Sequence, residues 1–116
     1  MKRFLAVYTG SPNAFEKWQA LDEAERKKRE AAGMQAWGAW QAAHQSVIVD
    51  QGGPLSKTKR TSTTGIADVR NNLGGYVIIQ ADSHEAAAKL FEKHPHFTIF
   101  PGDAVETMEI LPIPGQ

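Results

Sequence analysis

Cysteine is absent from this chain, and so are a net charge and any long apolar run. Without cysteine there is no disulfide framework, no thiolate zinc site and no thiol nucleophile. Thirteen Lys and Arg residues balance thirteen Asp and Glu residues, so the chain lacks the basic field that holds nucleic acid or anionic lipid. We therefore expect neither nucleic acid nor membrane among its partners.

Signals for export and for cofactor binding are also missing. The apolar run behind Met1-Lys2-Arg3 extends only from Phe4 to Tyr8, which is too short for a secretory signal, and no other segment approaches a membrane span. We therefore interpret the protein as cytoplasmic. No phosphate loop, dinucleotide fingerprint, metalloprotease signature or nucleophile motif is present, so the sequence predicts no cofactor and gives no support to covalent catalysis.

What is present is ordinary globular composition for one domain. The 116 residues are 41% hydrophobic and 22% charged, and a chain of this length builds a single core. Strand and helix patterns alternate without a linker or an internal repeat. The predicted elements are a strand at 3–9, helices at 12–21 and 22–45, a strand at 46–50, a polar strand or hairpin arm at 57–65, a buried strand at 76–81, a helix at 82–93 and a strand at 105–111.

Several residues mark where the helices begin and end. Ser11-Pro12 is a helix N-cap followed by proline at the first helical position. Asp22 and Asp82 each precede a Glu by three residues, which predicts capping boxes and a break in the first helical region near Leu21. Pro95 is expected to end the last helix. For the strand at 46–50, the Gly-Gly-Pro cluster that follows is expected to act as the stop.

This order fits a split β-α-β pattern, so we predict an α+β fold of the ferredoxin-like β-α-β-β-α-β type with an antiparallel sheet. In such a fold the helices cover one face of the sheet. The strands at 3–9 and 76–81 are apolar on both sides, which indicates that the second face of the sheet is also excluded from water. We expect a second subunit to cover it, making a homodimer.

Three segments resemble the YCII-related family of small dimeric α/β-barrel proteins. They are Gly53-Pro54-Leu55, GGYVIIQADSHEAA at 74–87 and VETMEILPI at 105–113. The resemblance implies one YCII-like domain over residues 1–116, a dimeric α/β barrel, and in some members a His and an Asp facing a small-molecule pocket. This sequence has no His within 34–37, where that family's histidine is expected, and has His94-Pro95-His96-Phe97 in place of Asp-Pro-Phe.

His44 and Asp50 are the candidate catalytic pair. His44 shares a helical face with two tryptophans, and Asp50 ends the next predicted strand. A carboxylate on one imidazole nitrogen fixes the tautomer and raises the basicity of the other, which is a general-base arrangement. The alternative is that His44 caps its helix and Asp50 serves the turn at 52–53.

The candidate substrate-binding residues surround this pair. Trp37 and Trp40 would form the apolar walls of a pocket for a flat ligand, or would belong to the core. His94 and His96 lie two residues apart, and two imidazoles alone do not make a metal site, so no metal is expected. Together with Phe97 they would form a further pocket wall. In the basic segment 57–60, Arg60 would bind an anionic substrate, or the segment is simply solvated.

Two functional hypotheses follow from these residues. In the first, the protein is an enzyme that transfers protons on a small aromatic or carbonyl-bearing molecule in a pocket near the dimer interface, with His44 as base and Asp50 as its orienting group. In the second, the protein is a non-catalytic dimeric module that binds a small ligand or a partner. The sequence leaves both open.

Overall fold

A four-stranded antiparallel sheet carries the fold, in the order β2-β5-β1-β6. The computed structural model describes residues 1–115. Its elements, in chain order, are β1 (Lys2–Thr9), α1 (Pro12–Gln19), α2 (Glu23–Ala43), β2 (Ile48–Pro54), β3 (Thr58–Ser62), β4 (Gly65–Val69), β5 (Leu73–Ala81), α3 (His84–Lys89), α4 (Pro95–Thr98) and β6 (Ala104–Glu109). The predicted α+β, ferredoxin-like class is confirmed.

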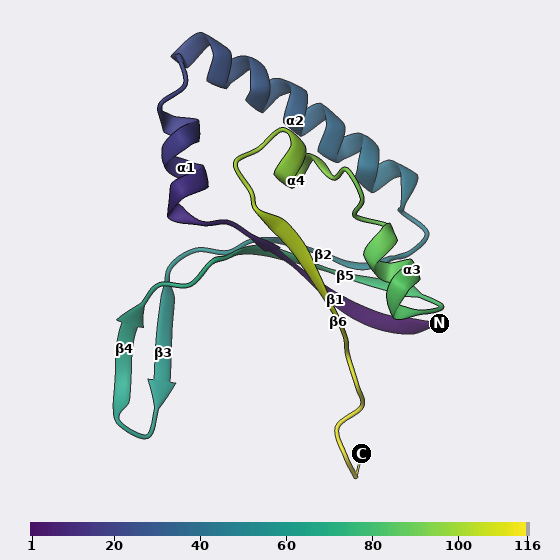
Figure 1. Ribbon diagram of the computed structural model, residues 1–116. Helices are drawn as coiled ribbons and strands as arrows, with labels where there is room; N and C mark the ends of the chain where they lie inside the picture. The colour runs from purple at the N-terminus through teal and green to yellow at the C-terminus, as the bar shows by residue number, and fades with distance from the viewer. Residues whose placement is uncertain (116) are drawn as a thin grey trace.

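The helices lie together on one face of this sheet, with the long α2 stretched across it (Figure 1). Alternate residues of β1 point to that face, so Phe4, Ala6 and Tyr8 are buried there. They pack with Trp40 of α2 and with Phe91, which follows α3. The core is therefore a single layer between the sheet and the helices.

Within residues 1–115, no helix covers the opposite face of the sheet (Figure 1). Leu5 is paired with Ile78 of β5 on one side and with Met108 of β6 on the other, so the three side chains form a row across the sheet. Met108 is 42% exposed. The sequence pattern of strands apolar on both sides is present, but a single copy of the chain leaves the second face uncovered.

The predicted first helix boundaries are confirmed. Ser11 caps α1, with its hydroxyl oxygen accepting a hydrogen bond from the Ala14 N–H at 3.4 Å, and Pro12 is the first helical residue. The expected break near Leu21 separates α1 from α2. Asp22 is the N-cap residue of α2, although its side chain makes no capping hydrogen bond.

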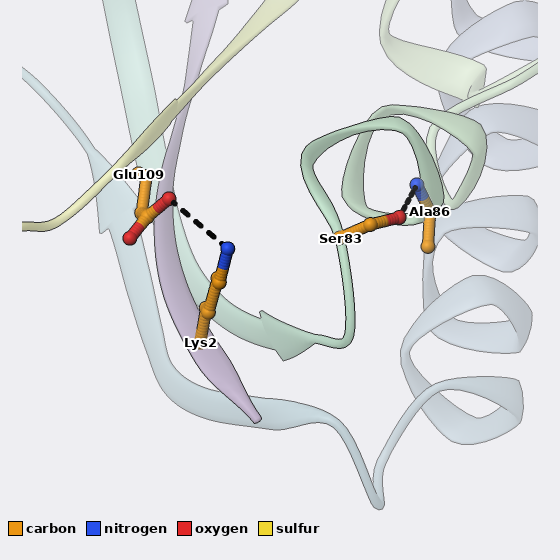
Figure 2. Close-up of polar contacts among 4 residues, drawn as sticks. All are labelled: Lys2, Ser83, Ala86 and Glu109. Atoms are coloured by element: carbon orange, nitrogen blue, oxygen red, sulfur yellow. Dashed lines mark hydrogen bonds and ion pairs between the residues drawn. The ribbon is translucent and has the colours of Figure 1, made fainter.

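The region after β5 differs from its prediction in three ways. Ser83, not Asp82, caps α3, and its hydroxyl accepts from the Ala86 N–H at 3.1 Å (Figure 2). The helix ends at Lys89 rather than at residue 93, where Lys93 has a positive φ of 58° that a helix cannot contain. Pro95 then begins the short α4 instead of ending a helix, because proline suits a first helical position.

Two strands also depart from their predicted bounds. β2 continues through Gly52, Gly53 and Pro54 rather than stopping before them, because two register shifts let this irregular segment keep its pairing with β5. β6 covers 104–109 rather than 105–111. At its end, the exposed Glu109 lies 3.9 Å from Lys2 of β1 (Figure 2), an ion pair that contributes about 0–1 kcal/mol at a surface.

The polar segment after β2 forms a hairpin, β3 and β4, that projects from the sheet (Figure 1). This agrees with the predicted exposed strand or hairpin arm. Lys59 and Asp68 form a 2.7 Å ion pair across it. We call residues 58–69 the arm.

Candidate functional site

A cavity of about 560 Å³ lies between α2 and the sheet. Its walls are mainly aromatic side chains and glycine backbone. The lining residues are Tyr8, Met34, Trp37, Gly38, Trp40, Gln41, Gln51, Gly52, Gly53, Pro54, Gly74, Gly75, Tyr76, Val77, His96 and Phe100. A site of this size accommodates a small organic molecule.

The wall contributed by α2 is a stripe at helical spacing. Met34, Trp37, Gly38 and Gln41 stand at i, i+3, i+4 and i+7, so they lie on one side of the helix. Trp40 reaches the cavity from a neighbouring position and is anchored, because its indole N–H donates to the Leu90 carbonyl oxygen at 2.8 Å. The stripe gives the cavity one apolar, indole-rich wall.

The facing wall is backbone from β2 and β5. Gly52 has a φ of +61°, and a Cβ there would overlap the backbone carbonyl of Tyr76, so a side chain at this position would disrupt the pairing of the two strands. Gly74 and Gly75 continue the same wall on β5. A wall of glycine backbone is flat and presents peptide groups rather than side chains to a ligand.

His96, on α4, lies at one end of the cavity, and two contacts fix the position of its ring. Its Nε2 is 2.8 Å from the Thr9 carbonyl oxygen, and because a carbonyl can only accept, Nε2 carries the proton. In the neutral ring Nδ1 is then the free proton acceptor. Gly102 also packs against the Nε2 end of the ring, where a Cβ would overlap the imidazole. The ring therefore has one tautomer and one position.

The charge state of His96 is set by opposing effects. Burial lowers its pKa, while the hydrogen bond to the Thr9 carbonyl and the nearby Asp103 carboxylate act in the raising direction. The net pKa is below the ordinary value of a histidine. At neutral pH the ring is therefore a neutral base rather than a cation.

His94 is sealed beneath the cavity and is 1% exposed. Its Nδ1 accepts the backbone N–H of His96 at 3.0 Å, so the two histidines are directly linked. Its Nε2 has no hydrogen-bond partner, and its ring lies 4.6 Å from Trp37 and 4.8 Å from Trp40, centroid to centroid. Burial, assisted by the rings of His96 and His44, lowers the pKa of His94 to about 4.

Tyr8 offers the cavity a phenol. Its ring centroid is 4.9 Å from that of Trp37 and 5.1 Å from that of His96. Burial raises the pKa of Tyr8, so the hydroxyl stays protonated. Tyr8 is one of the residues that line the cavity, and it is 6% exposed.

The structure does not bring His44 and Asp50 together. His44 ends α2, and its Nδ1 lies 2.8 Å from the Trp40 carbonyl oxygen, to which it donates. Asp50 is exposed and accepts the Gly52 N–H at 2.9 Å. The hydrogen-bonded general-base pair expected from the sequence is therefore absent, and the two residues make the helix-end and turn contacts of the alternative.

The other candidate residues are divided between cavity and surface. Trp37, Trp40 and His96 do line one cavity, as the sequence suggested, while His94 packs behind it. Phe97 is 37% exposed and lies outside the lining, and Arg60 is exposed on the arm. Within residues 1–115 no group of three His, Asp or Glu side chains has the arrangement of a metal site. None of the helices over the same residues is long and apolar enough to cross a membrane.

Tyr8 and Phe100 are two cavity residues that the sequence did not single out. Tyr8 could have been found, since strand alternation puts it on the same face as Phe4 and Ala6, at the end of β1. Phe100 had no such signal. It enters the cavity because its ring packs against Gly33 of α2, where a Cβ would lie about 2.5 Å from it.

Comparison with known proteins shows a likeness to solved structures. Neither the family models nor the curated proteins include a match to this chain. Among solved structures, the chain is similar to 5-chloro-2-hydroxyhydroquinone dehydrochlorinase (TftG) from Burkholderia phenoliruptrix AC1100, in complex with 2,5-dihydroxybenzoquinone. The TM-score is 0.52 at 19% identity, over 91% of this chain and 90% of that chain. The likeness shows that this chain shares the α+β fold of that enzyme.

Proposed function

We propose that the protein is a small-molecule enzyme that binds a flat, uncharged ring compound in the cavity and moves a proton with His96. The observation that carries the proposal is the hydrogen bond from His96 Nε2 to the Thr9 carbonyl. It fixes the tautomer and leaves Nδ1 as the proton acceptor of a ring that lines a cavity walled by indole. At neutral pH such a base is unprotonated and can accept a proton.

The lining itself indicates the class of ligand. None of the lining residues is Lys, Arg, Asp or Glu, and His96 carries the one imidazole among them. A bound carboxylate or phosphate would therefore lack a cation to pair with. Trp37 and Trp40 favour an aromatic or quinone-like ring, and the glycine wall admits its flat face.

The chemistry that fits these groups is enolisation or its phenolic equivalent. The bond from hydrogen to a carbon beside a carbonyl breaks, its proton moves to Nδ1 of His96, and the electron pair shifts onto the carbonyl oxygen. The Tyr8 hydroxyl donates a hydrogen bond to that oxygen as its negative charge develops. The imidazolium then returns the proton to a different atom, which completes an isomerisation without an external oxidant.

Isotope exchange tests this proposal most directly. Hydroquinone serves as the neutral binding probe, and cyclohex-2-enone, a neutral ketone whose hydrogens beside the carbonyl exchange only slowly with deuterium without a catalyst, serves as the reaction probe followed by proton NMR. We expect His96→Gln to lose enzyme-dependent exchange, while His44→Gln, which alters a histidine outside the lining, keeps it. Exchange that persists in His96→Gln at the wild-type rate would contradict a base at this position.

A non-catalytic binding role is the second candidate, and one contact favours it. The group that orients His96 is a backbone carbonyl rather than a carboxylate, so its basicity gains less than in a His-Asp pair. In that role hydroquinone binds to the wild type and to His96→Gln alike, and neither protein accelerates exchange. Calorimetric titration of both proteins separates this outcome from catalysis.

We also propose that a second copy of the chain covers the open face of the sheet, as expected for a protein of the YCII-related type. The row of Leu5, Ile78 and Met108 is the apolar part of that face, and the basic arm and the acidic β6 lie toward opposite sides of it. A two-fold arrangement can place one copy's arm against the partner's β6. Sedimentation of the wild type should show a dimer. Met108→Glu should dissociate this dimer, whereas Ala32→Glu, on the outer side of α2, should not. A monomeric wild type would contradict the proposed dimer.

A further inference from the structure

Two glycines in this chain could carry a side chain without a steric clash. Of the ten glycines, all within the described residues, eight have either a positive φ or another atom within 4 Å of the place a Cβ would occupy. Gly38 and Gly53 have neither, so a methyl group at either position would meet open space on an ordinary backbone. Sterics therefore do not explain the absence of a side chain.

Both glycines have an energetic cost. Glycine inside a helix is about 1 kcal/mol less favourable than alanine, and glycine inside a strand costs about 0.5–1 kcal/mol. Gly38 lies within α2 and Gly53 within β2. Since sterics do not require glycine at either position, a requirement for it would lie outside folding.

That requirement is at the cavity, which both residues line from opposite sides. Gly38 is exposed at the edge of α2, and Gly53 is half-buried on β2. The α2 neighbours of Gly38 at the cavity are Met34, which is 67% exposed, and Gln41. Both are long, flexible side chains that can turn aside for a ligand, whereas a Cβ is fixed to the backbone.

We propose that Gly38 and Gly53 are specificity-determining residues that set the size of the ring compound admitted between α2 and β2. The inference rests on the proposed function of the cavity and adds a substrate class to it, namely fused two-ring phenols and quinols in addition to single rings. The cavity volume of about 560 Å³ exceeds what one six-membered ring requires, and a Cβ at Gly38 or Gly53 would occupy space that is now open.

Calorimetric titration with two neutral probes tests this, hydroquinone for one ring and 2,6-dihydroxynaphthalene for two. Wild type should bind both. Gly38→Ala and Gly53→Ala should bind the two-ring probe at least about tenfold more weakly, the usual cost of misplacing one carbon atom in an apolar pocket, with hydroquinone affinity nearly unchanged. Ala39→Gly, an exposed α2 position outside the lining, should keep both affinities.

Thermal denaturation supplies a readout that needs no ligand. Gly38→Ala should raise the melting temperature and Ala39→Gly should lower it. A lower melting temperature in Gly38→Ala would overturn the inference, because the glycine would then serve the fold. If wild type binds both probes and the alanine variants bind them equally well, only the inference about size selection is wrong. If wild type binds neither probe, the proposed function is wrong as well.

Discussion

Acid should destabilise this protein through His94. Burial lowers the pKa of this ring from 6.5 to about 4, whereas the unfolded chain keeps the ordinary value. At pH values between these two, the unfolded state holds a proton on this residue that the folded state does not. The stabilising contribution is therefore complete above pH 6.5 and is lost progressively as the pH falls toward 4.

The magnitude follows from the gap between the two pKa values. A difference from 6.5 to about 4 corresponds to about 3 kcal/mol, lost at about 1.4 kcal/mol for each pH unit. That amount is a substantial part of the total stability of a domain of this size. Urea unfolding at several pH values between about 7.5 and 4.5 measures it as the slope of the free energy of unfolding against pH.

The variant His94→Asn isolates this slope. Asparagine can still accept the His96 N–H as a helix N-cap but does not titrate, so its stability should depend less on pH than that of wild type. Phe91→Leu is the matched control, because it loosens the packing around His94 and lowers stability at every pH while leaving the ring in place. Parallel curves for wild type and His94→Asn would refute the reasoning.

Three further substitutions test the local structure. Ser83→Ala should lower the free energy of unfolding by about 1 kcal/mol through loss of the helix cap, measured by urea unfolding; no change would show that the cap is redundant. Gly33→Ala should lower the melting temperature despite a gain in helix propensity, because the new Cβ would meet the Phe100 ring; a rise would show that the ring moves aside. Gly102→Ala should displace the His96 ring, and a nitrogen-detected NMR spectrum that still shows an Nε2-protonated tautomer would disprove the close contact.

Much of the fold follows from local sequence patterns. The N-cap and proline at Ser11-Pro12 and the break near Leu21 are encoded within a few residues, and both predictions are confirmed. The ferredoxin-like arrangement follows from the order of strands and helices, because an antiparallel sheet with helices on one face has few ways to satisfy that order. Sequence signals within a few residues are therefore sufficient to predict helix ends that are set by neighbouring residues.

The details that failed depend on contacts distant in sequence or on unusual backbone. β2 continues through Gly52 and Gly53 because β5 supplies a partner strand, which no glycine-proline rule anticipates. After α3, the backbone N–H groups of residues 90–92 donate to carbonyls three residues earlier, and Lys93 then has a positive φ, a conformation that lysine seldom adopts. Pro95 can end or begin a helix, and tertiary packing decides between the two.

The site was predicted only in part, for a related reason. Trp37 and Trp40 share a helical face, so their joint presence in a wall could be inferred from spacing. The pairing of His44 with Asp50 required knowledge of how the helix ends and how β2 bulges, and both features direct these side chains to backbone groups instead. The tautomer of His96 depends on Thr9, which is 87 residues away in sequence.

The arm has a consequence for how the chain tolerates insertions and deletions. Its ladder runs from Thr58 with Val69 to Ser62 with Gly65 and is separate from the main sheet. At its base, the Leu55 N–H donates to the Gly74 carbonyl at 3.0 Å, so β2 and β5 are already joined before the arm begins. The arm can therefore be lengthened, shortened or replaced by a tight turn while the glycine wall of the cavity stays in place, which makes its surface and the ligand site independently variable parts of one small domain.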